Sequence, residues 1–156
     1  GPRRVVASPR PKKILDLHVI QSLIAKNAIV ICCGGGGIPV IEKDGHYIGV
    51  PAVIDKDHLS ALLSIEMNVD ALIISTAIDA IRTGFGSEDD KIHSELTIEQ
   101  AKMYLENGEF PVGSMGPKVA SLIKAAEQID DFKSVLCQPG DAIKALRGDS
   151  GTTIVK

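Results

Sequence analysis

Two lysines of the sequence stand in surroundings that suit an anionic ligand. Lys56 lies between Asp55 and Asp57, whose carboxylates can hold its ammonium in place while that ammonium reaches a phosphoryl oxygen. Lys118 follows the small-residue stretch 113–117 at an expected helix start, where a lysine opposes the helix dipole unless an anion is bound. Phosphoryl transfer needs positive charge around its transition state more than it needs a general base. The two lysines therefore favour phosphoryl transfer, while the triplet around Lys56 is also consistent with an ordinary solvated charge cluster.

Four consecutive glycines form a second candidate site. Residues 34–37 follow the apolar run 28–33 directly, and Ile38 and Pro39 come next. A backbone without side chains lets N–H groups approach a phosphate or carboxylate closely. The spacing matches neither the dinucleotide-binding fingerprint nor the P-loop. The glycines therefore predict contact with an anionic substrate, and the alternative is a tight turn that binds nothing.

The cysteines and histidines predict no metal site. Cys32, Cys33 and Cys137 follow apolar runs and have no metal-ligand spacing, which favours buried, inert thiols. The four histidines do not have the spacing of metal ligands, and the sequence shows no pattern typical of a Ser/His/Asp catalytic triad.

Composition narrows the function classes. With 156 residues, 44% of them hydrophobic but only 3% aromatic, the chain has room for one domain, residues 1–156, with an aliphatic core. A formal net charge of -3 gives no electrostatic drive towards nucleic acid or anionic lipid. No apolar run approaches the ~20 residues of a membrane-spanning helix, and no signal peptide is visible. We therefore expect a cytoplasmic protein without nucleic-acid or membrane partners.

Hydrophobic periodicity predicts alternating helices and strands. Thr97 and Gln100 form a capping-box signature, and Pro117 suits the first turn of a helix. The strands are continuous apolar runs, which indicates a mostly parallel sheet covered on both faces that binds ligands at its carboxyl ends. The expected helices are 14–26, 57–68, 97–107, 117–128 and 141–146; the expected buried strands are 28–33, 71–74, 134–137 and 152–155, with a hairpin at 40–48 and a loop at 83–94.

These pieces together resemble the carbamate kinase family. The resemblance rests on residues 1–6, 34–40, 52–57, 85–86, 108–118 and 146–152, which occur in order and cover nearly the whole chain. Residues 108–118 are the most specific of them. The resemblance implies an amino-acid-kinase fold, a three-layer α/β/α sandwich, of which this chain matches the carboxyl-terminal, nucleotide-binding half. The amino-terminal half of the family is absent from the sequence.

The resemblance also implies roles for individual residues. Lys56 and Lys118 would be the catalytic lysines that polarise the transferring phosphoryl group, with Asp55 orienting Lys56. Gly35 and Gly36 would lie near the reaction centre. The remaining residues implied to bind ADP or ATP are Ser75, Asp79, Phe85, Gly86, Met115, Gly116 and Pro117.

The activity implied is the interconversion of ATP plus carbamate with ADP plus carbamoyl phosphate. The family uses Mg²⁺ and forms homodimers, so we expect a homo-oligomer that works in arginine metabolism. The family's amino-terminal half supplies backbone donors to the phosphates, and losing one such donor can cost ~10²-fold in rate. We therefore expect activity only with that half, in the same or another chain.

One stretch departs from the family pattern. The usual Thr-Asp-Val-Asp-Gly-Val-Tyr is replaced at residues 76–82, where Ala77, Ala80 and Arg82 stand in place of an acid, a glycine and an aromatic residue. This departure supports an alternative function, a non-catalytic nucleotide-binding or assembly module. Calorimetry that finds nucleotide binding without turnover would favour this alternative. A third possibility is a different acid acceptor within the amino-acid-kinase superfamily.

Overall fold

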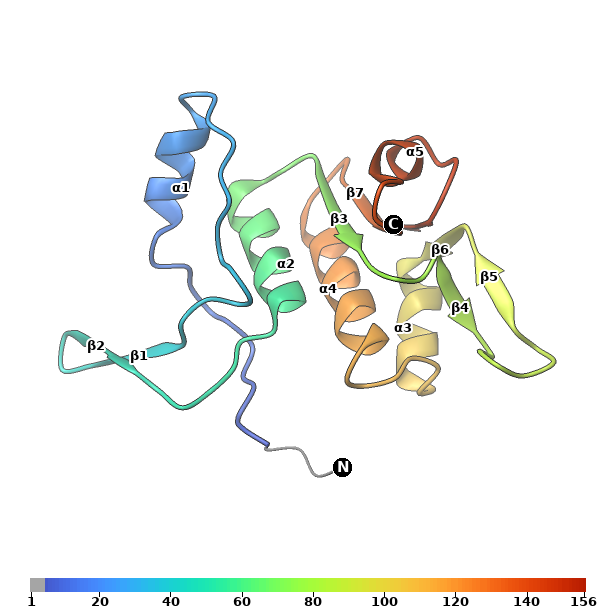
Figure 1. The fold of residues 1–156 in the computed structure, drawn as a ribbon, viewed down its shortest axis with the longest axis horizontal. Helices are drawn as coiled ribbons and strands as arrows, with labels where there is room; N and C mark the ends of the chain where they lie inside the picture. Colours follow the sequence, from blue (N-terminus) through green and yellow to red (C-terminus); the bar gives the residue numbers. More distant parts are fainter. Residues whose placement is uncertain (1–4) are drawn as a thin grey trace. The chain divides into compact units, whose positions relative to one another are not determined.

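The computed structural model describes residues 5–156, and the chain divides into two compact units, Gly1–Leu63 and Ser64–Lys156. The boundary falls within helix α2 (Lys56–Met67), coloured green in Figure 1. We call the two parts unit 1 and unit 2. The expectation of one domain over residues 1–156 stays a prediction, since compactness alone does not establish that either unit folds by itself.

The described residues of unit 1, from 5 onward, form one helix and one hairpin before α2. Helix α1 (Leu17–Ile24) lies within the predicted range 14–26 and buries Ile20. Strands β1 (Val40–Lys43) and β2 (His46–Gly49) pair antiparallel, which confirms the predicted hairpin. Asp44 and Gly45 form its turn with φ of 52° and 76°, as a two-residue hairpin turn requires. All eight residues of the two strands are exposed, so the hairpin is peripheral within this unit.

The predicted buried strand at residues 28–33 is wrong. The segment forms no strand, and Ile29 and Ile31 are both 98% exposed. A fully buried strand needs paired neighbours on its edges and layers on both faces, and apolar composition cannot supply either. The prediction of buried thiols fails here for the same reason, because Cys32 and Cys33 are only half-buried, whereas Cys137 in unit 2 is buried as predicted.

Unit 2 is built on a four-stranded sheet with the order β3-β7-β8-β6. Its strands are β3 (Ala71–Ser75), β6 (Glu95–Thr97), β7 (Lys133–Cys137) and β8 (Thr152–Val155). The pairs β3–β7 and β6–β8 are parallel, and β7–β8 is antiparallel. The predicted mostly parallel sheet is thus confirmed, with one antiparallel pairing where the chain returns through the short helix α5 (Ala142–Leu146).

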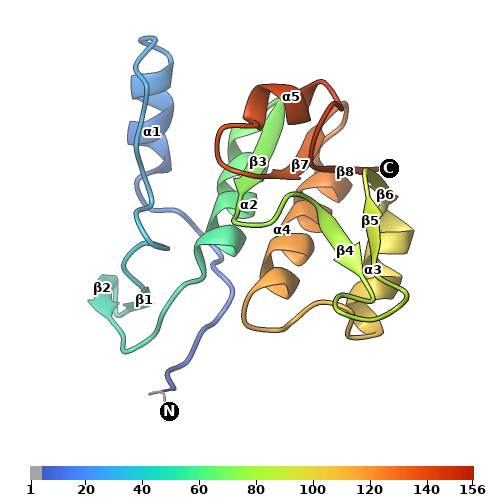
Figure 2. The same cartoon turned by 45° about the vertical axis from the view of Figure 1, so that its right-hand side comes forward.

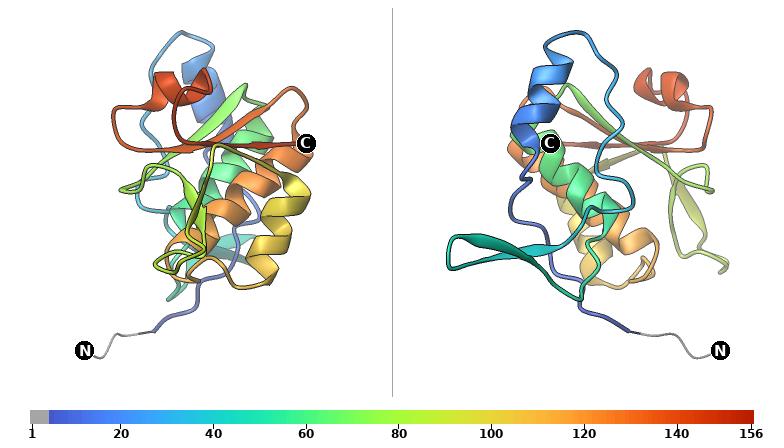
Figure 3. Two further views of the ribbon diagram at one scale, coloured as in Figure 1. Left: turned by 90° about the vertical axis from the view of Figure 1, so that its right-hand side faces the viewer. Right: turned by 60° about the vertical axis from the view of Figure 1, so that its left-hand side comes forward.

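Helices cover both faces of this sheet. Helices α3 (Ile98–Glu106) and α4 (Met115–Gln128) lie on one face and α5 on the other, as the left view of Figure 3 shows. Strand β7 explains the arrangement, because its side chains alternate between faces. Leu136 joins the aliphatic core under α3 and α4, whereas Val135 and Cys137 pack with Ala145 of α5. The α/β/α layering expected from the sequence is therefore present in unit 2.

The ends of the helices follow the sequence signals closely. Thr97 caps α3: its Oγ1 accepts a hydrogen bond from the Gln100 N–H (3.2 Å), and the Thr97 N–H donates to Gln100 Oε1 (3.0 Å). Gly108, with φ of 76°, ends the same helix. Helix α4 begins at Met115, two residues before the predicted start at Pro117. The capping box and the helix-ending glycine are local signals, which is why the sequence could place these boundaries.

The region 83–94, predicted as a loop, is in part a hairpin. Strands β4 (Ile81–Thr83) and β5 (Lys91–His93) pair antiparallel, and only residues 84–90 form the connecting loop (Figure 2). The hairpin is tied to β8, since Thr152 Oγ1 accepts from the Ile81 N–H (2.7 Å) and donates to the His93 carbonyl. The sequence analysis did not predict these two short strands, because the segment is rich in glycine and charged residues, a composition typical of loops.

Candidate functional site

The larger of the two cavities described in unit 2 has a volume of about 760 Å³. It opens at the carboxyl end of the parallel strands β3 and β7, beside the residues that follow each strand. A crevice at this position is where open α/β sheets bind ligands, and the volume suits a molecule of nucleotide size. The lining residues are Ala77, Ile78, Asp79, Arg82, Gly84, Phe85, Ser87, Asn107, Gly108, Glu109, Phe110, Pro111, Ser114, Met115 and Gln138.

The cavity brings together three of the residues expected to bind nucleotide: Asp79, Phe85 and Met115. Four others, Ser75, Gly86, Gly116 and Pro117, are outside its lining, although each lies within two residues of a lining residue in the sequence. Sequence reasoning assigned no site role to Arg82, Asn107, Glu109, Phe110, Ser114 or Gln138. Two signals pointed towards this set: the departure at Arg82 and the family-like segment 108–118.

The charged groups of the cavity are linked to one another. The Arg82 guanidinium places Nη1 at 3.1 Å and 3.2 Å from the two Asp90 carboxylate oxygens and Nε at 3.6 Å from Asp79 Oδ1. Glu109 Oε2 accepts a hydrogen bond from the Gly84 N–H (2.9 Å). The lining thus contains two carboxylates, of Asp79 and Glu109, and one guanidinium. This balance disfavours a phosphate inside the cavity and suits the uncharged part of a ligand.

Two aromatic residues line the same cavity and differ in their exposure to solvent. Phe110 is only 3% exposed and belongs to the aliphatic core, whereas Phe85 is 77% exposed. An exposed phenyl ring at a cavity offers its face to a flat ligand group. Phe85 is therefore available for stacking, and Phe110 is a structural wall.

The amino terminus of α4 carries the second predicted lysine. Lys118 is half-buried in the first turn of α4. Gly116 is buried in the same turn, and its N–H donates to the Pro111 carbonyl (3.0 Å). A Cβ on Gly116 would lie 3.3 Å from that oxygen, so the glycine permits close packing of the 111–116 turn. The turn positions Met115 in the lining of the cavity and fixes the start of α4, and with it the position of Lys118 in the first turn of the helix.

In unit 1, Lys56 starts helix α2 between two carboxylates with different tasks. Asp55 Oδ1 accepts hydrogen bonds from the N–H groups of Asp57 (2.8 Å) and His58 (3.2 Å), so Asp55 caps the helix. The Lys56 ammonium pairs with Asp57 Oδ1 at 2.8 Å, where the Asp57 side chain is buried and the Lys56 side chain is 57% exposed. Asp55 thereby fixes the helix start that carries Lys56, while Asp57 holds the ammonium.

The glycine loop packs against the segment that leads to Lys56. Gly36 has φ of 134°, and a Cβ there would lie 1.8 Å from the Ile54 carbonyl oxygen. Its N–H donates to the Cys33 carbonyl (2.9 Å). Gly35 has nothing within 4 Å in the direction of a Cβ. Unit 1 therefore brings Gly36 and Lys56 together, with Gly35 as the open position of the loop.

The described residues contain neither a metal-binding cluster nor a membrane-spanning helix. Within residues 5–156, no group of three or more His, Cys, Asp or Glu side chains is placed to hold a metal ion. Over the same residues, no helix has both the length and the apolar character needed to cross a membrane.

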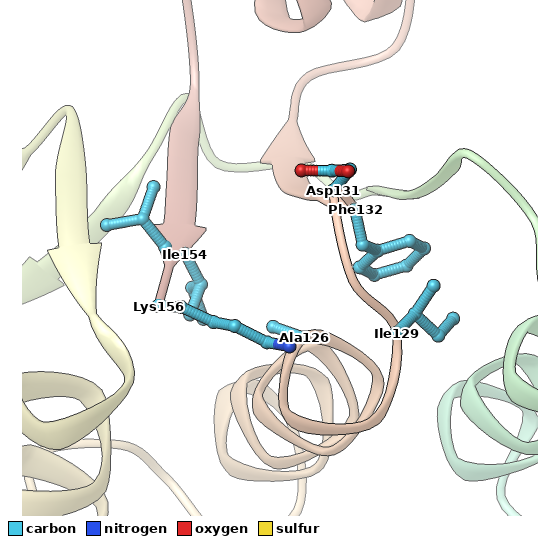
Figure 4. Close-up of a pocket in the computed structure, with 7 residues that line it drawn as sticks. Ala126, Ile129, Asp131, Phe132, Ile154 and Lys156 are labelled. Carbon is cyan, nitrogen blue, oxygen red and sulfur yellow. The ribbon is translucent and has the colours of Figure 1, made fainter.

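A second, smaller cavity of about 240 Å³ lies elsewhere in unit 2 (Figure 4). It is lined by Ala126, Ile129, Asp131, Phe132, Ile154, Val155 and Lys156. The Lys156 side chain extends towards Ala126 on α4, and its ammonium pairs with Asp130 at 2.5 Å. None of the residues expected to do chemistry lines it.

Comparison with known proteins places these observations in context. A model described as the amino acid kinase family matches residues 2–132. The carbamate kinase of Clostridium perfringens is 44% identical over 156 residues, which are 100% of this chain and 50% of that protein. The carbamate kinase-like protein YahI of Escherichia coli is 41% identical over 157 residues, 100% of this chain and 49% of that protein. The chain thus spans about half the length of the curated relatives it matches.

Solved structures agree with the sequence relatives. A carbamate kinase from Giardia lamblia bound to AMP-PNP superimposes with a TM-score of 0.94 at 37% identity, over 97% of this chain and 48% of that chain. The N-acetylglutamate synthase of Neisseria gonorrhoeae, at 16% identity and a TM-score of 0.62 over 90% of this chain and 31% of that one, shares only the fold.

Proposed function

The chain belongs to the amino acid kinase family, and on this premise we propose that it is the nucleotide-binding part of a carbamate kinase. The reaction would transfer a phosphoryl group between ATP and carbamate, giving ADP and carbamoyl phosphate. Support comes from relatives at 40–44% identity that are named carbamate kinase and from a 37% identical structure of a carbamate kinase bound to AMP-PNP.

The observation that carries the proposal is the cavity at the carboxyl end of β3 and β7. It gathers Asp79, Phe85 and Met115, which the resemblance alone assigned to the nucleotide, around a space of about 760 Å³. Asp79 and Phe85 flank strand β4, whereas Met115 begins helix α4, in a separate part of the sequence. Their convergence on one crevice supports nucleotide binding at this position.

The chemistry of the cavity indicates how a nucleotide would enter it. The base would stack on the exposed Phe85 ring, and ribose hydroxyls would donate to carboxylates such as Asp79 and Glu109. The excess of carboxylates would leave the phosphates outside. The resemblance assigns one task to the ammonium groups of Lys56, in unit 1, and Lys118, in unit 2: each would neutralise the charge that spreads over the transferring phosphoryl oxygens.

The two glycines would have different tasks in this reaction. The Gly36 N–H already donates to the Cys33 carbonyl, and its backbone packs against Ile54. Gly35 is exposed, with nothing within 4 Å in the direction of a Cβ, so its backbone is the more open of the two to a substrate oxygen. Asp55 would act indirectly, by capping the helix that begins with Lys56.

The rest of the proposal concerns the whole protein. Because the chain spans about half the length of its relatives, we propose that turnover requires the part those relatives have in addition, in the same or another chain. Mg²⁺ would supply further positive charge to the phosphates, as phosphoryl transfer generally requires, although the described residues contain no group of three or more His, Cys, Asp or Glu to hold it. We further propose a homo-oligomer in the cytoplasm that serves arginine metabolism.

Lys118→Met tests this function in a protein that combines this chain with the remaining half. We expect ATP formation from ADP and carbamoyl phosphate to fall by about 10²-fold or more, because a charge aimed at the transition state is lost. Lys124→Met, on the same helix and also half-buried, is the matched control and should keep its rate. Equal rates for the wild type and Lys118→Met would contradict the proposal.

A second candidate is a nucleotide-binding module without turnover. The specific observation behind it is Arg82, which stands in place of the family's aromatic residue and lines the cavity with two carboxylates bound to it. Titration calorimetry with ADP and ATP separates the candidates: binding without ATP formation in the combined protein favours the module, and binding with turnover favours the kinase.

A further inference from the structure

Arg82 forms a bridge between two carboxylates at the edge of the larger cavity. Its guanidinium contacts Asp90 at 3.1 Å and 3.2 Å and lies 3.6 Å from Asp79. The side chains of Arg82 and Asp90 are only 28% and 26% exposed. Asp79 follows strand β3, whereas Asp90 directly precedes strand β5. The bridge therefore joins the end of the central sheet to the far end of the 84–90 loop.

The 84–90 loop is an ordered turn that contributes Gly84, Phe85 and Ser87 to the cavity. The Gly84 carbonyl accepts hydrogen bonds from the N–H (3.0 Å) and hydroxyl (2.7 Å) of Ser87. Gly84 has φ of 62°, and a Cβ there would lie 2.6 Å from the Asp89 carbonyl oxygen. Because the turn is closed in this way, whatever fixes its two ends also fixes the backbone that carries Phe85.

The strands alone hold those ends weakly. Strands β4 and β5 share three residue pairs, and a two-stranded hairpin of this size is marginal in water. The Thr152 hydroxyl of β8 ties the hairpin at Ile81 and His93. Two side-chain contacts within the hairpin reinforce it further: the buried hydrogen bond between Thr83 Oγ1 and His93 Nε2 (2.8 Å) and the ion pair between Arg82 and Asp90. The Arg82 pair lies at the loop side, immediately beside the cavity.

Arg82 also balances charge at the cavity. The Arg82 guanidinium contacts the carboxylates of Asp79 and Asp90, and the Glu109 carboxylate accepts from the Gly84 N–H at the start of the loop. A neutral residue at position 82 would leave both of these carboxylates without that cation, which would repel the phosphates of a bound nucleotide. Loss of Arg82 should thus weaken binding twice, through the loop and through the charge.

We propose that Arg82 is a positioning residue for the nucleotide: bound to Asp79 and Asp90, it holds the 84–90 loop and the Phe85 ring against the cavity and sets the affinity of the site. The inference rests on the proposed function, since it assumes that the cavity holds a nucleotide. It adds a residue that replaces the family's usual aromatic with an ionic anchor, so that position 82 contributes through its charge and hydrogen bonds.

The test compares four variants of this chain by titration calorimetry with ADP. Arg82→Met should raise the Kd about 5- to 10-fold, an effect of about 1 kcal/mol. Asp90→Asn should raise the Kd by less, because it breaks the same ion pair but also removes one of the carboxylates that repel the phosphates. The double variant should be no weaker than Arg82→Met, because both changes remove one interaction. Arg147→Met, an exposed arginine at the end of α5, is the matched control and should bind as the wild type does.

Two further readouts distinguish positioning from a general loss of structure. Amide hydrogen exchange at residues 85–90 should speed up in Arg82→Met and Asp90→Asn without nucleotide, while exchange in α4 stays the same. Arg82→Lys should recover only part of the affinity, because an ammonium cannot reproduce the guanidinium fork. In the combined enzyme, Arg82→Met should raise the KM for ADP by more than it lowers kcat.

The outcomes separate the positioning role of Arg82 from the proposed nucleotide site. Wild-type affinity in Arg82→Met, or unchanged exchange at residues 85–90, would overturn the inference and leave the proposed function standing. If the wild-type chain binds neither ADP nor ATP, the proposed nucleotide site fails and the affinity role of Arg82 fails with it. The exchange comparison still decides in that case whether Arg82 holds the loop.

Discussion

Unit 1 and unit 2 differ in how far several of their apolar side chains are buried. In unit 2, Leu122, Leu136 and Ile154 are fully buried between the sheet and helices α3 and α4. In unit 1, Ile29 and Ile31 are 98% exposed, and Ile38 is 87% exposed. The same residue types therefore pack into the sheet core of unit 2 and stand exposed in residues 29–38 of unit 1, although unit 1 also buries Ile20, Leu59 and Leu62.

The difference shows that burial depends on available partners as much as on hydrophobicity. Strand β7 is buried because β3 and β8 pair with it and helices cover both of its faces. Residues 28–33 are just as apolar but have no paired strand in the described part of the chain. The side chains of Ile29 and Ile31 therefore remain exposed. This segment immediately precedes the glycines of the proposed reaction centre.

The largest effect that would test this contrast comes from equivalent truncations in the two units. Leu122→Ala should lower the free energy of unfolding by about 2–5 kcal/mol, because it opens a cavity in a packed core. Ile31→Ala should change it by less than about 0.5 kcal/mol, because its side chain is already exposed to water. Urea unfolding of the chain followed by circular dichroism measures both values. A cost for Ile31→Ala as large as that for Leu122→Ala would show that residues 28–33 are covered after all.

A smaller effect is expected at the glycine loop of unit 1. Gly36→Ala should strain the loop by about 1–3 kcal/mol, because an L-residue disfavours φ of 134° and its Cβ would collide with the Ile54 carbonyl. Gly35→Ala is the matched control, with no neighbour within 4 Å. Amide exchange at residues 33–37 should increase in the first variant and not in the second. Equal exchange in both would mean that the packing of Gly36 on Ile54 does not order the loop.

The sequence predicted those features of the fold that depend on local signals. The capping box at Thr97, the hairpin turn at Asp44 and Gly45, and the apolar runs of β3 and β7 all lie where expected. The strand at 28–33 failed because its partners are not local. Strands β4 and β5 were missed because three-residue strands leave almost no periodic pattern.

The residues of the candidate site also fall into those that the sequence predicted and those that depend on contacts made in the fold. Asp79, Phe85 and Met115 were expected from the resemblance and do line one cavity. Glu109 and Arg82 were not assigned, because their contribution depends on partners distant in the sequence: Gly84 lies 25 residues from Glu109, and Asp90 lies 8 residues from Arg82. Motif matching locates the residues around a site, whereas the contacts that hold them in place require the fold.

The smallest expected effect is a pH dependence that belongs to unit 2 alone. Burial lowers the pKa of His93 below its ordinary value of 6.5, and the Lys91 ammonium adds to the effect. The unfolded chain therefore binds more protons than the folded chain below about pH 6.5, so stability should fall as pH drops through this range and level off below the folded pKa. His93→Gln should flatten this part of the stability profile, measured by urea unfolding between pH 5 and 8.

The same variant should lower stability at pH 8 too, because it disturbs the hydrogen bond with Thr83 and the ring contact with Tyr104. A slope that persists in His93→Gln would assign the titration to a different group, and a slope that disappears would locate the acid sensitivity of unit 2 in the hairpin that carries Arg82.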